Sequence, residues 1–192
     1  MKYACILPLA AIMLCSCQSV DKLTPDQARE KLKATHKITD VEMKDDQGRT
    51  ALMAAAANGN TDLVKLLVKA GANVNAKASG QNAEMQMRDY TPLMVAVGRS
   101  NLAATQALLA AGADVNAKAV TVSGKTTMNG VTPLFVATAN NDAGCVKALL
   151  GAGANAAAKV SVAGSGEMTA LDLATAAKNA ELIMLLSAAM PD

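Results

Sequence analysis

Residues 91–118 read TPLMVAVGRSNLAATQALLAAGADVNAK, and the same pattern returns along the chain. Thr-Pro-Leu or Thr-Ala-Leu begins at residues 50, 91, 132 and 169, and a pair of leucines follows each of them. After the first three leucine pairs comes a Gly-Ala motif, which begins at residues 71, 112 and 153. Internal repetition of this kind is typical of proteins that stack copies of one structural unit.

Each unit predicts two short helices. Thr91 can accept a hydrogen bond as an N-cap, and Pro92 fits the first helical position because the N–H that it lacks would have no partner there. Gly or Asn predicts the end of the first helix, near residues 58–59, 98, 140–141 and 179. Apolar residues then recur at helical spacing, at Leu63, Val64, Leu66 and Leu67. Such a pair cannot bury its apolar side alone, so we expect the units to stack.

The Thr-Pro-Leu opening and the later Gly-Ala-Asp-Val-Asn-Ala-Lys resemble the ankyrin repeat, from about residue 40 to the C-terminus. The resemblance implies an all-α solenoid of about four ankyrin repeats, each a helix-turn-helix, with extended β-hairpin loops. We expect the ankyrin-repeat domain to span residues 48–192, with repeats at about 48–80, 89–121, 130–162 and 167–192. Residues 25–47 are expected to form a helical N-terminal cap, which Thr24 and Gln27 begin as a capping box.

Two departures from the family are informative. Ankyrin repeats commonly place a His after Thr-Pro-Leu, and this chain has Met53, Met94, Phe135 and Asp172 there. We therefore expect apolar packing to replace a polar brace in three units. The opening threonines are also 41, 41 and 37 residues apart, against a family period of about 33.

The extra residues fall in the loops and predict enlarged hairpins. Apolar and polar residues alternate at 120–122, 160–162 and 85–87, and turn residues follow or precede them at 123–124, 164–166 and 80–82. Three enlarged hairpins should therefore lie side by side along one edge of the stack. Because ankyrin proteins usually bind partners through their hairpins and inner helices, the resemblance places the binding surface there.

The composition offers few large anchors for a partner, with no Trp, one Phe and two Tyr. Tyr90, just before Thr91, is the best candidate for an exposed anchor, and the alternative is that it only covers the neighbouring repeat. Arginine is also common at interface centres. The candidate partner-binding residues are Tyr90, Arg49, Arg88, Arg99, Val131 and Lys125.

The first residues predict export. Lys2 precedes an apolar run over residues 4–14, which is too short for a membrane anchor and is typical of a secretory signal. Residues 14–17, Leu-Cys-Ser-Cys, resemble a bacterial lipoprotein box. That resemblance implies a signal peptide over residues 1–16, a lipid on Cys17 and a tether over residues 17–24; a plain signal peptide cut nearby is the alternative. Gln18 resembles an outer-membrane sorting residue, so we expect a lipid-anchored envelope protein that faces the periplasm.

The sequence gives little support for nucleic-acid binding, nucleotide binding, metal binding or catalysis. The net charge of +2 includes Lys2, so the mature chain is nearly neutral and no nucleic-acid partner is expected. Residues 124–126, Gly-Lys-Thr, resemble the end of a phosphate loop, but Ala119 stands where that loop needs Gly. His36 is the single His, and no His/Cys/Asp cluster has zinc spacing. Cys145 is expected to be buried filler. We predict no enzyme, no cofactor and no metal site.

Four methionines fall in the predicted hairpins: Met85, Met87, Met128 and Met168. Their thioethers suit cuprous copper, since soft metals prefer soft sulfur ligands. The alternative, which we prefer, is an apolar stripe by which neighbouring hairpins pack, because unbranched Met fills irregular gaps well.

The function expected from the resemblance is non-catalytic protein–protein interaction by a monomer that binds an unidentified protein partner. One version is an adaptor for envelope proteins. Another is a periplasmic inhibitor or immunity protein that blocks a secreted enzyme or toxin. The sequence does not separate them. An enzyme with a site assembled across the repeat surface is a third alternative, but no acid/base constellation supports it.

Overall fold

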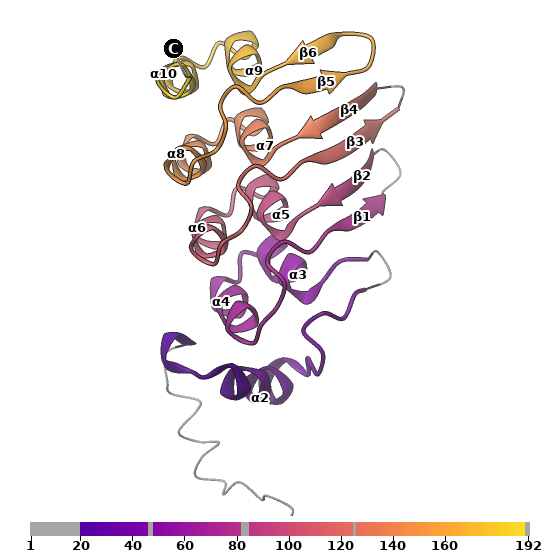
Figure 1. Cartoon of the computed structure of the whole chain (residues 1–192), viewed down its shortest axis with the longest axis vertical. Coiled ribbons are helices and arrows are strands. Elements are labelled where there is room, and N and C mark those ends of the chain that lie inside the picture. Colours follow the sequence, from indigo (N-terminus) through magenta and orange to yellow (C-terminus); the bar gives the residue numbers. More distant parts are fainter. Residues whose placement is uncertain (1–19, 46–47, 82–84, 125, 191–192) are drawn as a thin grey trace, which may run out of the picture.

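The computed structural model describes residues 20–45, 48–81, 85–124 and 126–190, and it forms an elongated stack of helix pairs (Figure 1). The inner helices lie between the outer helices and a β-sheet. The inner row consists of α3 (Ala51–Ala57), α5 (Pro92–Gly98), α7 (Pro133–Ala139) and α9 (Ala170–Ala176). The outer row consists of α4 (Thr61–Lys69), α6 (Leu102–Ala110), α8 (Ala143–Gly151) and α10 (Ala180–Ala188). Each row packs helix against helix along the stack.

Each inner helix begins at the threonine that the sequence predicts. Thr91 Oγ1 accepts a hydrogen bond from the backbone N–H of Met94 at 3.4 Å, and Thr50, Thr132 and Thr169 cap their helices in the same way. Asp172 completes a capping box, because its Oδ2 accepts a 2.8 Å bond from the N–H of Thr169. These bonds satisfy N–H groups that a helix terminus otherwise leaves unpaired.

The first helix of each pair ends near the predicted Gly or Asn, but in two units the residue of positive φ is of another type. The chain reverses at a residue of positive φ, which is Gly59, Ser100, Asn141 or Lys178 in successive units. Gly98 instead ends α5 two residues before the reversal, and Asn179 is the N-cap of α10. In these two units the Gly or Asn, which adopts a positive φ easily, therefore lies near the reversal and not at the residue of positive φ itself.

One continuous core runs between the two helix rows. The leucine of each opening motif is fully buried in the first three units, at Leu52, Leu93 and Leu134. Leu67, Leu108 and Leu149 of the outer helices face them in the same core. Burial of a leucine side chain contributes about 1.5–3 kcal/mol, so the stacked leucines supply much of the stability. Cys145 is fully buried in this core, as predicted.

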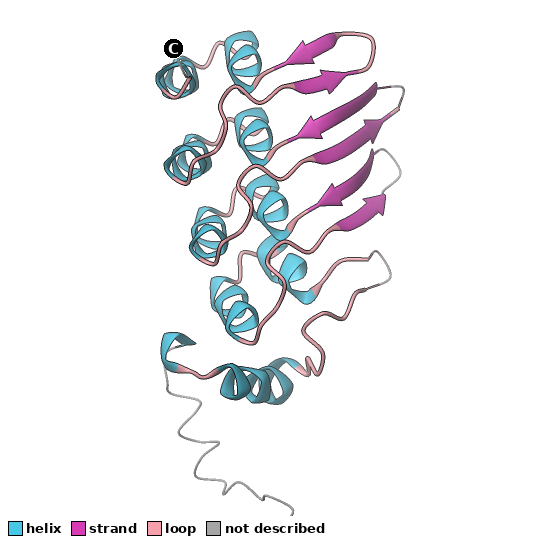
Figure 2. Ribbon diagram, in the orientation of Figure 1, coloured by secondary structure: helices cyan, strands magenta, loops and turns pink. Residues whose placement is uncertain are grey.

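The three hairpins form one antiparallel sheet of six strands, in chain order (Figure 2). The strands are β1 (Ala78–Gln81), β2 (Met85–Tyr90), β3 (Ala119–Ser123), β4 (Thr126–Val131), β5 (Val160–Val162) and β6 (Gly166–Met168). Neighbouring hairpins join because β2 pairs with β3 and β4 with β5. The prediction of hairpins side by side is confirmed. The all-α class is imprecise, because this sheet runs along the solenoid.

The N-terminal end of the stack is covered by α2 (Pro25–His36), which packs against α4. It begins at the predicted capping box of Thr24 and Gln27. Arg29 Nε donates a 2.9 Å hydrogen bond to the carbonyl oxygen of Ala70, at the C-terminal end of α4. A short 3₁₀ helix, η1 (Val20–Lys22), precedes α2, and Leu23 between them is buried in the helical core. The expected tether over residues 17–24 is therefore wrong for residues 20–24, because they pack on the stack. None of the helices described here has the length and apolarity needed to cross a membrane.

Candidate binding surface on the sheet and inner helices

The strand register gives the sheet two chemically different faces. Met87 lies opposite Thr121, Thr121 opposite Met128, and Met128 opposite Val162. Directly opposed residues share a face, and successive residues of a strand alternate between faces. The other face therefore carries Gln86, Arg88, Val120, Val122, Thr127, Asn129, Ser161 and Glu167. One face is apolar and the other is mainly polar.

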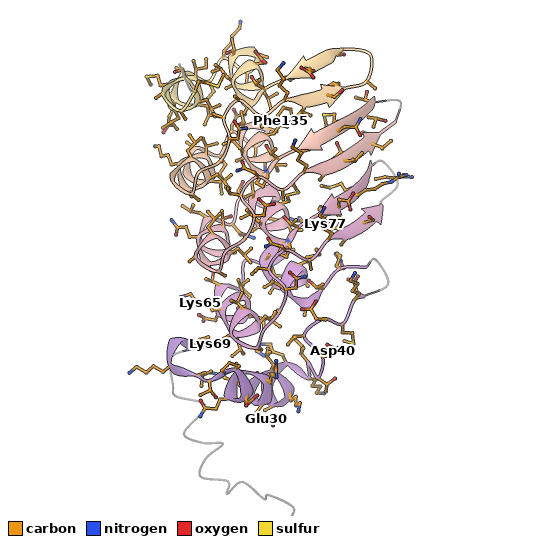
Figure 3. All side chains as sticks on the ribbon, in the orientation of Figure 1. Glu30, Asp40, Lys65, Lys69, Lys77 and Phe135 are labelled. Atoms are coloured by element: carbon orange, nitrogen blue, oxygen red, sulfur yellow. The ribbon has the colours of Figure 1, made fainter. Side chains whose placement is uncertain are left out.

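The apolar face meets the inner helices through the residues that replace the family His. Met53 and Met94 are buried in a cluster with the hairpin residues Ala78, Tyr90 and Ala119. Phe135 is buried with Val131 and Val160 in a second cluster, at the place labelled in Figure 3. Apolar packing at these three positions was predicted and is confirmed. Because these side chains join helix to sheet, they fix the angle at which each hairpin leaves its helix pair.

Half-buried apolar side chains continue outward from these clusters. Met87 and Val95 pack against the first cluster, and Met128, Val136, Val162, Met168 and Leu173 pack against the second. We call these residues, together with Thr121, the apolar strip. Its members come from the sheet and from α5, α7 and α9. The strip contains no charged side chain and remains partly exposed, so it is an apolar surface that a partner can cover.

Thr121 differs from the rest of the strip. Its side chain is only 6% exposed, and its Oγ1 has no hydrogen-bond partner within the described part of the chain. Its direct neighbours on the same face are Met87 of β2 and Met128 of β4. An unpaired buried hydroxyl costs free energy, and native proteins usually avoid it. Thr121 is therefore an unsatisfied polar group in an otherwise apolar surface.

The polar face carries several exposed basic residues. Lys77, Lys118 and Lys159 occupy equivalent positions just before or at the start of a hairpin, and all three are exposed (Figure 3 labels Lys77). Lys159 Nζ forms a 2.8 Å ion pair with Glu167 Oε2, and the hydrogen bond to Glu167 raises the pKa of Lys159. Arg88 is also exposed on this face.

Two predicted anchors are buried. Tyr90 was expected to be exposed, but only 7% of it is accessible. Its ring packs beside Gly80, where an added Cβ would lie 3.0 Å from the Tyr90 hydroxyl. Val131 is 3% exposed. The expectation of exposure is wrong for Tyr90, and the candidate Val131 is likewise buried, because both complete the junction between hairpin and helix. For Tyr90 the alternative holds, since it packs with Met53 of the preceding unit.

The remaining predicted residues are not brought together into one site. Arg49 pairs with Asp45 through a 2.7 Å contact between its Nη2 and Asp45 Oδ2. Arg49 also lies near Tyr90: burial raises the pKa of that phenol, while the charge of Arg49 opposes the rise. Arg88 lies on the polar face of the sheet, and Arg99 is the exposed C-cap of α5. Lys125 and Cys17 lie outside the described residues.

The sequence partly anticipated the strip. Met87, Met128 and Met168 lie in the hairpins and pack against the apolar clusters, as the packing interpretation predicts; the side chain of Met85 lies outside the described structure. The contribution of Val95, Val136 and Leu173 was missed. Their signal was present, because each follows directly after the position of the replaced His. Gly80 and Gln81 were also expected in a turn but belong to β1.

Two titratable groups of the described chain, Cys145 and Asp172, have shifted pKa values with structural causes. Burial raises the pKa of the Cys145 thiol to about 11, and the nearby Asp142 adds to the rise. A thiol with so high a pKa is a poor nucleophile at neutral pH. The hydrogen bonds from Thr169 lower the pKa of Asp172. In the described ranges no three His, Cys, Asp or Glu side chains gather as metal ligands would.

Helix pairs of one kind, stacked in two parallel rows, define a solenoid repeat protein. A family model for ankyrin repeats in three copies matches residues 11–119, and a model for the single ankyrin repeat matches residues 129–159. The chain therefore belongs to the ankyrin-repeat family. No curated protein matches it in sequence. Ankyrin repeats generally mediate binding to partner proteins and are typically non-catalytic.

Proposed function

We propose that this chain is a non-catalytic, monomeric protein-binding module, held on the bacterial cell envelope by a lipid on Cys17, and that it binds its partner with the apolar strip. The observation that carries the binding role is the continuous sheet, whose apolar face meets the inner helices. Three separate hairpins would present three small contacts. One sheet instead presents a single surface that spans three units.

The exposed state of the strip supports a binding role. Met87, Val95, Met128, Val136 and Val162 are each partly accessible although they pack on buried clusters. Contiguous apolar surface of this kind commonly marks a site of protein interaction. Methionine adapts its shape to different partners because its side chain is unbranched and flexible.

The anchor rests on sequence. An apolar run ends in Leu14, Cys15, Ser16 and Cys17, and only a few residues separate Cys17 from η1, so the proposed tether is very short. In this arrangement the lipid would hold the solenoid at the surface of the outer membrane, on the side that faces the periplasm.

The binding role can be tested with a photo-crosslinking amino acid in intact cells. We expect the crosslinker at position 128, on the strip, to form an adduct with a discrete partner. At position 127, the next residue and on the opposite face of the sheet, it should form little or none. Adducts formed only from position 127, or from neither position, would count against the proposal.

The anchor has its own test. Cells that express the chain are fed a clickable fatty acid, and labelling and membrane fractionation are measured. Cys17→Ala should abolish both the label and membrane association, whereas Cys15→Ala should retain them. A label that persists in Cys17→Ala would disprove the anchor and leave the binding role standing. The crosslinked partner also separates the two versions of the function: one tightly bound secreted enzyme or toxin indicates an inhibitor, and several partners indicate an adaptor.

A further inference from the structure

We propose that the apolar strip binds an uncharged, apolar segment of the partner polypeptide, and that the Thr121 hydroxyl hydrogen-bonds to the backbone of that segment. This inference rests on the proposed function, because it names the chemistry of the partner at the same surface. It makes Thr121 the residue that determines the position of the bound segment.

The charge distribution selects the partner. The opposed sheet residues on the face of the strip, Met87, Thr121, Met128 and Val162, are all uncharged. The opposite face of the sheet carries Arg88 and Glu167 and the neighbouring Lys77, Lys118 and Lys159. A charged side chain placed against the strip would lose its hydration and find no opposite charge. An uncharged apolar segment has no charge to desolvate, and it covers apolar area. Complementarity therefore favours an uncharged segment.

Thr121 adds a polar requirement to this surface. Its Oγ1 is buried without a partner between Met87 and Met128 of the neighbouring strands. Both methionines are only half-buried, so their flexible ends can move aside when a segment lands on the strip. The hydroxyl can then donate to a backbone carbonyl or accept from a backbone N–H. Every polypeptide offers these groups, so the bond fixes position without demanding a particular side chain.

An acidic segment on the polar face is the main competing occupant. That face offers Lys77, Arg88 and Lys118 as exposed cations. However, Lys159 is already paired with Glu167, and the basic side chains are interspersed with Gln86, Thr127, Asn129 and Ser161. No buried polar group on that face lacks a partner among the residues described. These observations favour the apolar face.

The test is a selection from a random peptide library, displayed on phage, against the full chain purified in detergent from a bacterial host. We expect the enriched peptides to share an uncharged apolar core. Their affinities are then measured for Met128→Lys, which places a charge in the strip, and for Thr127→Lys, which places it on the other face. Binding should fall at least about tenfold for the first and change less than about twofold for the second. Val162→Lys repeats the test at another strip position if Met128→Lys fails to fold.

The role of Thr121 is tested with Thr121→Val, which keeps the shape and removes the hydroxyl. Because the hydroxyl is unsatisfied in the free protein, this variant should melt at the same temperature as the parent or higher. It should nevertheless bind the selected peptides about five- to tenfold more weakly. Thr127→Val is the matched control and should bind as the parent does.

Three results would overturn the inference. Acidic peptides whose binding is lost in Lys118→Ala but not in Met128→Lys would leave the chain a binding module and place its ligand on the polar face. Undiminished peptide affinity in Thr121→Val would show that the Thr121 hydroxyl makes no hydrogen bond to the bound segment. A failure to enrich any peptide above a library panned on detergent alone would count against both the inference and the proposed function.

Discussion

The reversal between paired helices places different residues in one backbone conformation. Gly59, Ser100, Asn141 and Lys178 all have φ between 54° and 66°. Glycine adopts this left-handed conformation without strain, and Asn tolerates it. In a residue such as Lys the Cβ lies too close to the following carbonyl oxygen, so the conformation is strained. The last unit therefore stores strain at an exposed position, where a substitution disturbs no packing.

Lys178→Gly should relieve that strain. We expect the free energy of unfolding to rise by about 1 kcal/mol, because Gly is the preferred residue just after a helix. Lys178→Ala is the matched control: it also removes the Lys side chain, but it keeps a Cβ, so stability should stay within about 0.5 kcal/mol. Urea unfolding of both variants measures the difference. Equal stabilities of the Gly and Ala variants would show that the conformation costs little.

The cap of α8 predicts a pH dependence. Burial raises the pKa of Asp142, but hydrogen bonds from the backbone N–H and thiol of Cys145, and from the Ser100 side chain, outweigh it and leave the pKa of Asp142 below its usual value. The unfolded chain therefore takes up the proton first as pH falls. The stabilisation is complete above the unfolded pKa and is lost as pH falls toward the folded pKa.

Asp142→Asn should weaken this dependence. Asn60 and Asn179 cap the corresponding helices through their side chains, so the variant should match the parent at pH 7 within about 0.5 kcal/mol. Between about pH 5 and about pH 3 the parent should lose more stability than the variant. Chemical denaturation across this range checks the result. Parallel pH curves would mean that Asp142 does not contribute.

At the scale of elements, a ladder of amide side chains joins the loops that follow the outer helices. Asn75 Oδ1 accepts a 2.8 Å hydrogen bond from the N–H of Asp114, and its Nδ2 donates to the carbonyl oxygen of Gly112 at 3.4 Å. Asn116 repeats both bonds one unit later, with Asn155 and Gly153. The ladder holds the loops of neighbouring units in register next to the outer helices. The sheet does the same for the hairpins.

Asn116→Ala should cut one rung of this ladder. Two bonds are lost, at 2.8 and 3.3 Å, and we expect the free energy of unfolding to fall by about 1–2 kcal/mol. Asn129→Ala provides the control, since Asn129 is exposed on β4 and makes no side-chain hydrogen bond within the described structure. It should change stability by less than about 0.5 kcal/mol. Thermal unfolding of both variants decides whether the ladder carries stability.

The elements also show what sequence could predict and why. Helix starts were predicted because a cap such as Thr91 acts on a backbone N–H only three residues away. The hairpins were predicted because apolar and polar residues alternate over short stretches of the sequence. The pairing of β2 with β3 joins residues about thirty-five positions apart, and no local pattern specifies it. Tyr90 was misplaced for the same reason, because its burial depends on Met53 of the preceding unit.

At the scale of the whole molecule, the sheet changes how the units depend on one another. In a simple solenoid each unit contacts its neighbours only, and the ends open readily. Here three hairpins share one hydrogen-bonded sheet, in which β3 is paired on both sides, with β2 and β4. Among the described strands, β1 and β6 are the edges. Opening β3 therefore requires disruption of two neighbouring strands, whereas β6 can separate from β5 alone.

Hydrogen–deuterium exchange should reveal this difference. Because protection reports the free energy of local opening, amides of β3 that bond to β2 or β4 should exchange at least about tenfold more slowly than the bonded amides of β6. The inner helices α5 and α7, both in the interior of the stack, should differ from each other by less. If β3 and β6 exchange at similar rates, the hairpins open independently and do not act as one surface. Slow exchange shared by β2, β3, β4 and β5 would instead show that the strands between the two edges open together across the three hairpins, which is the property that a binding surface spanning several repeats requires.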